Sequence, residues 1–301
     1  NSQQYITVLG GPHTASGGME GKALVSTFEH SMIYDTTKKR AGSFEWNPVS
    51  GSTIEFWMKK DNFITGSTEK EVIVDIWNQE GTGSNSYGRI RLELTGAANG
   101  VGPLRLTMLS GTTGFQWRDI CPSSLTTASV ADGKWHHYAD TFNSDTDTVI
   151  NLYRDGTYLN TTTVSSTAIG AIENVSGGVN AFLGALQTEA SGTTSGVGYG
   201  KLSASLDEFK FWKTKRTTNE IGEFWFLDYG GGTNDAIHNK ELGVYLRFNE
   251  GITTNSSIDS TCLDYSGRIS NGVWTGYTAS ARSVDSGLVL SGFVDKEFKD
   301  P

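Results

Sequence analysis

Apolar and polar residues alternate with a period of two along most of the chain, which is the pattern of β-strands that bury one face. The alternation is clearest at residues 53–58, 72–77, 89–94, 104–109, 135–142, 148–154, 158–164, 179–183 and 205–212. Gly, Ser, Thr and Asn residues separate these stretches, and Asp155-Gly156 is a hairpin signal. The pattern predicts an all-β protein built from antiparallel sheets.

One segment interrupts this pattern with the features of a short helix near Thr217 to Phe224. Thr217 and Thr218 are suited to cap the helix, and Glu220 falls in its first turn. The positions that we expect to face inward are Ile221, Phe224 and Trp225. The sequence therefore predicts a single short helix beside the sheets.

Composition narrows the possible partners. With 37 Gly, 8 Trp and 11% aromatic residues among 301, the chain has many turn formers and enough large side chains for a substantial core. The net charge is −9 and the only basic cluster is the short run 38–40, so we expect no nucleic-acid partner. No apolar run approaches the ~18 residues of a membrane span, so we expect no membrane insertion. The sequence leaves open whether Cys121 and Cys262 pair.

Several stretches occur in the order and spacing of a known family. They are TIEFWM at 53–58, GKWHHYA at 133–139, LYRDG at 152–156, FLG at 182–184, LDEFKFW at 206–212 and TNEI at 218–221. Together they resemble the laminin-G-like and pentraxin-related branch of the concanavalin A-like lectin/glucanase superfamily. The resemblance covers roughly residues 19–225 and implies an antiparallel jelly-roll β-sandwich with one short helix.

The segment after the glycines at 230–232 carries a second resemblance. It contains LRFNEG at 246–251, LDYSGR at 263–268 and NG at 271–272, which are similar to the opening of the same family. This opening normally comes first in the chain, whereas here it follows the other motifs. We therefore expect an N-terminal arm at 1–18, a sandwich at 19–228 and a C-terminal extension at 229–301.

A jelly roll without its first strand leaves an unpaired edge, so the extension is expected either to pack back on the same sandwich or to cross to a neighbouring chain. The extension holds two apolar runs, 242–248 and 286–294. Related modules occur in series in virion proteins of bacterial viruses. The resemblance therefore implies a piece of a larger protein on a virion or another extracellular surface.

The resemblance also raises the question of catalysis. Retaining glucanases of this superfamily carry an E-x-D-x-x-E strand, which places two carboxylates about 5–5.5 Å apart. No such run is present. Glu71, Asp75 and Glu80 fall at offsets of four and nine, so the odd step puts Glu80 on the opposite face, and the adjacent Asp207 and Glu208 point apart. The sequence predicts no catalytic residues and no enzyme, with a polysaccharide-acting glycoside hydrolase as the alternative.

Metal ligands are similarly sparse. His136 and His137 are neighbours in a strand and diverge, so we interpret them as structural. The turn 143–147 lacks the glycine and the glutamate of an EF-hand loop. In pentraxins, calcium is bound just after the L-G strand and in an earlier loop. The residues here that correspond by type or position are Asn85, Gln187 and Glu189. Because Leu186 and Thr188 stand where acids are expected, the resemblance supports at most one calcium ion and no other cofactor.

Two aromatic residues in polar or glycine-rich surroundings, Trp117 and Tyr199, are candidates for stacking on a sugar, with packing as the alternative. The predicted ligand site thus contains Asn85, Trp117, Gln187, Glu189 and Tyr199. We expect a non-catalytic, lectin-like adhesion or structural module that binds surface glycan or neighbouring protein subunits. Those subunits include further copies of this chain in a homo-oligomer. A structural spacer without ligand is a further alternative.

Overall fold

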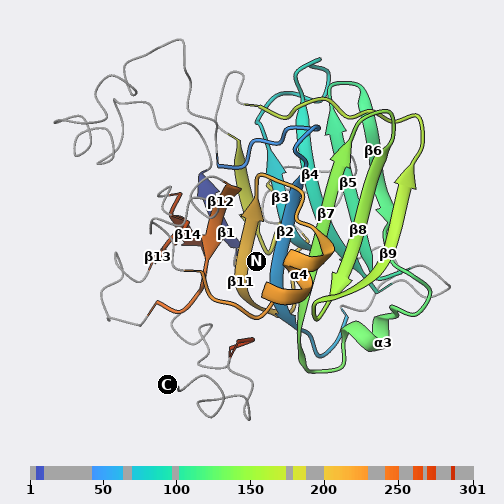
Figure 1. The fold of residues 1–301 in the computed structure, drawn as a ribbon. Helices are drawn as coiled ribbons and strands as arrows, with labels where there is room; N and C mark the ends of the chain where they lie inside the picture. Colours follow the sequence, from blue (N-terminus) through green and yellow to red (C-terminus); the bar gives the residue numbers. More distant parts are fainter. Residues whose placement is uncertain are drawn as a thin grey trace.

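The computed structural model describes residues 5–9, 43–63, 70–96, 102–173, 179–187, 200–229, 241–250, 260–266, 270–275 and 286–288. Two antiparallel sheets lie face to face and enclose one large core (Figure 1). The predicted fold class, an all-β jelly-roll sandwich, is confirmed. Each strand predicted from the alternating pattern is present, with bounds that differ by a few residues.

The larger sheet has eight strands in the order β13-β14-β1-β10-β3-β4-β5-β6. Their bounds are β1 Tyr5–Leu9, β3 Lys70–Trp77, β4 Gly88–Thr95, β5 Leu104–Ser110, β6 Thr113–Asp119, β10 Asn180–Leu183, β13 Thr261–Cys262 and β14 Gly272–Thr275. The N-terminal strand β1 pairs with β10 on one side and β14 on the other. Both ends of the chain therefore contribute to this sheet.

The smaller sheet has six strands in the order β12-β11-β2-β7-β8-β9. Their bounds are β2 Ser52–Lys59, β7 Trp135–Ser144, β8 Thr148–Arg154, β9 Thr157–Val164, β11 Ser205–Trp212 and β12 Leu242–Leu246. Asp155 and Gly156 connect β8 to β9 with φ of 50° and 72°, which are the left-handed values that a tight hairpin turn needs.

Alternation assigns each strand residue to the core or to an outer face. In β2, Ile54, Phe56 and Met58 lie in the core, and Glu55 and Trp57 face outward from the six-stranded sheet. A fully buried side chain of this size contributes roughly 1.5–3 kcal/mol to folding. The outward residues of both sheets are also largely buried, so they require specific partners.

Two helices lie among the described residues, α3 at Thr127–Val130 and α4 at Thr218–Phe224. The position predicted for α4 is confirmed, and so is its cap. The Thr217 side chain accepts a hydrogen bond from the Glu220 N–H, and the Glu220 carboxylate accepts one from the Thr217 N–H at 2.6 Å. Ile221 is buried as expected, but Phe224 is exposed, because the helix ends there and only its Ile221 side faces the sheet. Helix α3 was not expected.

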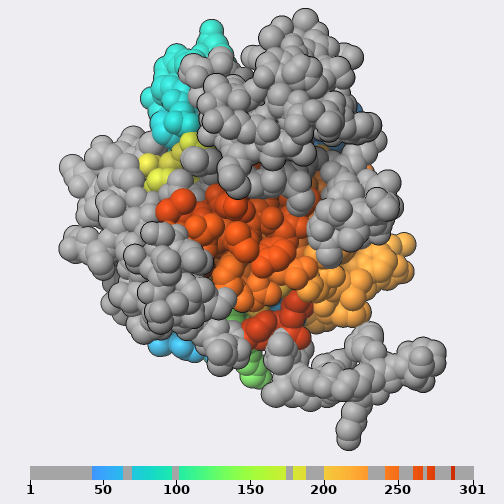
Figure 2. Space-filling view, turned by 90° about the vertical axis from the view of Figure 1, so that its left-hand side faces the viewer, coloured from blue at the N-terminus to red at the C-terminus, as the bar shows by residue number. Residues whose placement is uncertain are grey.

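The C-terminal extension packs back on the same chain, which is one of the two arrangements expected. β12 pairs with β11, while β13 and β14 join the eight-stranded sheet. Cys262 is buried, and Trp274 packs against Phe248 with ring centroids 5.8 Å apart. Figure 2 shows the orange-red residues of this segment together on one side of the molecule, beside the paler residues around α4. Residues 286–288 form a bend, and the rest of the run 286–294 lies outside the described residues.

Candidate functional site

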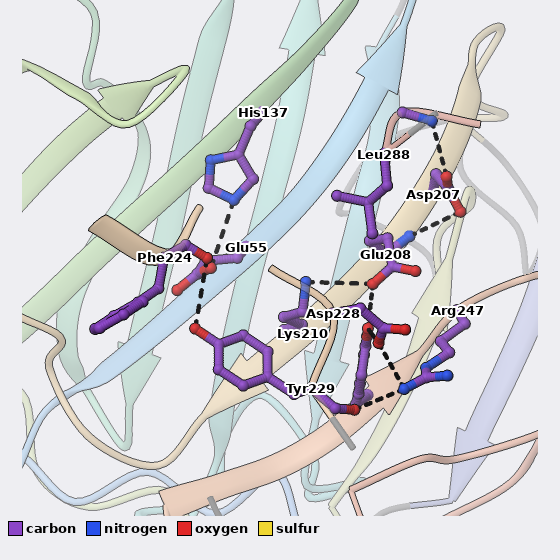
Figure 3. Close-up of polar contacts among 12 residues, drawn as sticks. Glu55, His137, Asp207, Glu208, Lys210, Phe224, Asp228, Tyr229, Arg247 and Leu288 are labelled. Atoms are coloured by element: carbon purple, nitrogen blue, oxygen red, sulfur yellow. Dashed lines mark hydrogen bonds and ion pairs between the residues drawn. The ribbon is translucent and has the colours of Figure 1, made fainter. Parts of the chain in front are cut away.

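The outer face of the six-stranded sheet carries a buried polar network (Figure 3). Glu55 lies 2.5 Å from Arg216 and 3.4 Å from His137, measured between side-chain oxygen and nitrogen atoms. Burial raises the pKa of Glu55, but the Arg216 guanidinium and His137 outweigh it and hold that pKa at about 2. Arg216 also donates to the Tyr229 hydroxyl at 3.0 Å. Glu55 is thus a carboxylate, and its charge is matched by Arg216.

The same network continues onto β11 and β12. A β-bulge between Asp207 and Lys210 leaves Glu208 with a φ of 52°. The Tyr245 hydroxyl bonds both Glu208 and Asp228, and Lys210 Nζ lies 3.3 Å from Glu208. Because of the bulge, Asp207 and Glu208 both lie on the outer face of the sheet. The expectation that they point apart was therefore wrong.

Neighbouring segments cover this network. Trp225, which follows α4, packs on Trp57 and His137 with ring centroids 5.2 and 5.9 Å apart. Asp207 accepts hydrogen bonds from Ser286 Oγ and Gly287 N at 2.6 and 2.9 Å. Because Glu55, Lys210 and Arg216 are almost fully buried and paired with one another or with neighbouring groups, we interpret their network as part of the packing of this face.

The outer face of the eight-stranded sheet is also charged. Asp75 in β3, Arg91 in β4 and Thr107 in β5 lie opposite one another across the strands. Two residues farther along β4, Glu93 lies opposite Arg105 in β5. The core side of these strands is apolar, so the charged residues are confined to the outer face.

Two of the ion pairs on this face are tight. Arg89 donates to both carboxylate oxygens of Asp75, at 2.7 and 2.5 Å. Arg91 Nε lies 2.8 Å from Glu93 Oε2. Such close pairs hold the side chains in place and neutralise both carboxylates.

Glu71 does not join these carboxylates. A register shift in β3 between Val72 and Val74 places Glu71 opposite Leu94, whose side chain lies in the core. Glu71 there bonds Lys60 at 2.6 Å. In a regular strand, the offset of four residues would place the Glu71 and Asp75 carboxylates on the same face of the sheet. The bulge places them on opposite faces.

Trp117 lies at the margin of this face, on the edge strand β6. The chain carries a bulge here, and Trp117 adopts a φ of 55°. Its N–H donates to Thr107 Oγ1 at 3.0 Å, and the residue as a whole is 37% exposed. Two cations lie over its ring: Arg105 Cζ is 5.1 Å and Lys70 Nζ 5.4 Å from the ring centroid. We call Lys70, Arg105 and Trp117 the Trp117 cluster.

The other predicted site residues have different positions. Asn85 is exposed in the loop between β3 and β4. Gln187 is buried, and its Nε2 donates to the carbonyls of Asp75 and Asn180 at 3.1 and 3.2 Å, which joins β3 to β10. Glu189 and Tyr199 lie outside the described residues. The sequence analysis missed Lys70 and Arg105, although the alternation of charged with apolar residues in 89–94 and 104–109 marks that polar face.

The described histidines, His136 and His137, lie beside carboxylates. His136 Nδ1 lies 2.7 Å from Asp155 Oδ2, and Nε2 lies 3.0 Å from Asp132 Oδ2, while His137 faces Glu55. Cys121 is half-buried and free, and Cys262 is buried. Within the described ranges, no three His, Cys, Asp or Glu residues are grouped to hold a metal ion. In the same ranges, no helix has the length and apolarity to cross a membrane.

Comparison with known families agrees with this fold. The model of the concanavalin A-like lectin/glucanases superfamily matches residues 36–222, which is more than half of the 301 residues. The chain belongs to that superfamily. The resemblance seen in the sequence motifs is confirmed. No curated protein matches the chain.

Solved structures with related folds have low sequence identity. A candidate carbohydrate-binding protein from Bacteroides ovatus is 18% identical over 78% of this chain and 55% of that one, with a TM-score of 0.44. A SAP-like pentraxin from Limulus polyphemus is 13% identical over 73% of this chain and 81% of its own, with a TM-score of 0.38. Tailspike protein 2 of Escherichia coli O157:H7 bacteriophage CAB120 is 14% identical over 68% of this chain and 24% of its own, with a TM-score of 0.41. This chain thus spans about half of the Bacteroides protein and a quarter of the tailspike.

Proposed function

We propose that this chain is a non-catalytic, lectin-like module that binds glycan at the Trp117 cluster. The observation that carries the proposal is the exposed indole of Trp117 at a φ of 55°. A bulky residue in the left-handed region is an outlier that costs about 1–3 kcal/mol, and such strain concentrates at ligand sites. A β-bulge is a common means of turning a side chain toward a ligand.

The surroundings of Trp117 suit a sugar. The apolar face of a sugar ring packs on an aromatic ring, and its hydroxyl groups need polar partners nearby. Lys70 and Arg105 supply donors beside the indole, and the half-buried Asp119 lies next to Arg105. Membership of a superfamily that includes lectins supports the same interpretation.

Hydrolysis is less well supported. A retaining glycosidase needs one carboxyl group as proton donor and a second as nucleophile, about 5–5.5 Å apart. On the outer face of the eight-stranded sheet, Asp75 is held by Arg89 and Glu93 by Arg91. Both carboxylates are therefore engaged in ion pairs.

We further propose that the module belongs to a larger protein on a virion or another extracellular surface. Neighbouring subunits would there be additional partners.

We also propose that a single calcium ion binds weakly at Asn85, Gln187 and Glu189. The side-chain N–H groups of Gln187 are already bonded to backbone carbonyls, which orients its amide and leaves the amide oxygen as the side-chain atom suited to a cation.

A glycan array tests the proposed function. The wild type should bind a defined set of glycans, and Trp117→Ala should lose that binding. Tyr158→Ala is the matched control, because Tyr158 is an aromatic residue of the other sheet that is 45% exposed. Each protein is assayed with and without calcium. Binding that persists in Trp117→Ala would contradict the assignment, and no binding by the wild type would favour a structural spacer.

A further inference from the structure

The two cations of the Trp117 cluster are paired more loosely than the other cations of this face. Lys70 Nζ lies 3.8 Å from Glu93, and Arg105 Nη2 lies 3.6 Å from Asp119. The pairs farther along the sheet, Arg89 with Asp75 and Arg91 with Glu93, have separations of 2.5 and 2.8 Å. The two cations beside the exposed indole therefore have the longest of these four ion-pair separations.

The acidic partners of Lys70 and Arg105, which are Glu93 and Asp119, also contact other groups. Glu93 lies a full ångström closer to Arg91 than to Lys70. Asp119 accepts hydrogen bonds from Gly102 N at 2.8 Å and Cys121 N at 3.0 Å. Asp119 is thus held by two backbone donors, and Glu93 lies nearer to Arg91 than to Lys70.

Arg105 also has unused donor capacity. Its Nε is buried and has no hydrogen-bond partner among the described residues, while Nη1 donates to the Trp117 carbonyl at a long 3.4 Å. Lys70 is one-third exposed, with a side-chain exposure of 33%. An incoming anion can therefore reach Lys70 directly, and the more deeply buried Arg105 lies beside it at the same indole.

The local charge balance is positive although the chain is acidic. Lys70, Arg91 and Arg105 provide three positive charges, and Glu93 and Asp119 provide two negative ones, which leaves an excess of one. The net charge of the whole chain is −9. A positive excess beside a sugar-stacking residue selects for an anionic substituent on the sugar.

We infer that the ligand of the Trp117 cluster is an acidic glycan, whose carboxylate contacts Lys70 and Arg105 while its sugar ring stacks on Trp117. A planar guanidinium matches a carboxylate with two parallel hydrogen bonds, and a flexible ammonium group adjusts to it. This inference rests on the proposed glycan-binding function and names the class of sugar that the same site takes.

The test compares probes that differ only in charge. Polygalacturonate is compared with its fully methyl-esterified form, and dextran sulfate with dextran, by isothermal titration at low and physiological salt. We expect polygalacturonate to bind at least tenfold more tightly than its ester, with affinity that falls as salt is added. Lys70→Gln and Arg105→Gln should each weaken polygalacturonate binding about tenfold, the size of a lost charge-assisted hydrogen bond.

Control variants separate charge from folding. Lys134→Gln removes an exposed cation at the turn before β7 and should leave the affinity unchanged. Lys70→Arg keeps the charge and should retain most of the affinity. Because Arg105 is buried, its variant is compared with the wild type by thermal midpoint, and the exposed Lys70 carries the test if Arg105→Gln unfolds.

The outcomes distinguish the inference from the proposed function. Equal binding of polygalacturonate and its ester overturns the inference and leaves the glycan-binding function intact. If the protein binds dextran sulfate but does not bind polygalacturonate, the anionic group of the ligand is not a carboxylate and that assignment is overturned. Absence of binding to every glycan, neutral ones included, overturns both.

Discussion

The backbone N–H of Trp117 donates to the side-chain oxygen of Thr107 on the neighbouring strand, 3.0 Å away. Thr107 is almost fully buried, and its hydroxyl replaces the backbone partner that the bulge in β6 removes. A buried N–H without an acceptor is costly, so this bond stabilises the unusual backbone of Trp117. The position of the exposed indole therefore depends on a buried residue of the neighbouring strand.

Thr107→Val tests this dependence. Valine keeps the shape of threonine and removes the acceptor, so the free energy of unfolding should fall by about 1–3 kcal/mol. Binding of the glycan identified for the wild type should weaken as well, because Trp117 is no longer held in place. Thr107→Ser retains the hydroxyl and should preserve both properties in urea denaturation and titration. A Thr107→Val protein with unchanged affinity would show that the bond has no part in positioning Trp117.

A second prediction concerns Asp140, which points from β7 into the core. Its side chain is fully buried, and neither oxygen has a hydrogen-bond partner among the described residues. Burial raises its pKa to about 8, so the folded protein keeps Asp140 protonated at neutral pH. An unfolded chain releases that proton near its ordinary pKa of about 3.9.

The sign of the effect on stability follows from this difference. Because the folded state binds the proton more tightly, the stabilisation is complete below about pH 4 and is lost as pH rises toward about 8. Asp140→Asn removes the ionisation. The free energy of unfolding between pH 5 and pH 7 should therefore fall by roughly 1.4 kcal/mol per pH unit more in the wild type than in the variant. Equal slopes in urea denaturation would mean that Asp140 titrates normally.

A third prediction concerns the covered network on the six-stranded sheet. Glu55→Gln leaves the Arg216 guanidinium buried without its carboxylate, which should cost about 3–5 kcal/mol of stability. The double variant Glu55→Gln/Arg216→Met removes both charges and should recover much of that loss. If the network is structural, the folded fraction of each protein should bind glycan with wild-type affinity. A folded Glu55→Gln protein that has lost glycan binding would instead make this face part of the ligand site.

Much of the fold was predictable because each outer or core position follows from the identity of its residue. Ile54, Phe56 and Met58 are apolar and alternate with Glu55 and Trp57, so the strand and its core face are both evident in the sequence. The short helix was predictable for the same reason, because its cap consists of side chains only three positions apart.

The candidate site was only partly predictable. Trp117 was identified from its polar surroundings, but strand β6 was missed, because the bulge interrupts the alternation on which strand prediction depends. Lys70 and Arg105 are distant in sequence from each other, and only the pairing of β3, β4 and β5 brings them to one indole. Bulges also misled the placement of Glu208, since one extra residue reverses the face of its neighbours.

The crystal structure of this protein with a bound acidic oligosaccharide tests the central claim most directly. The account predicts a sugar ring packed on the Trp117 indole, with its carboxylate within hydrogen-bond distance of Lys70 Nζ and the Arg105 guanidinium. A sugar bound elsewhere, with the Trp117 indole still exposed to solvent, would contradict it.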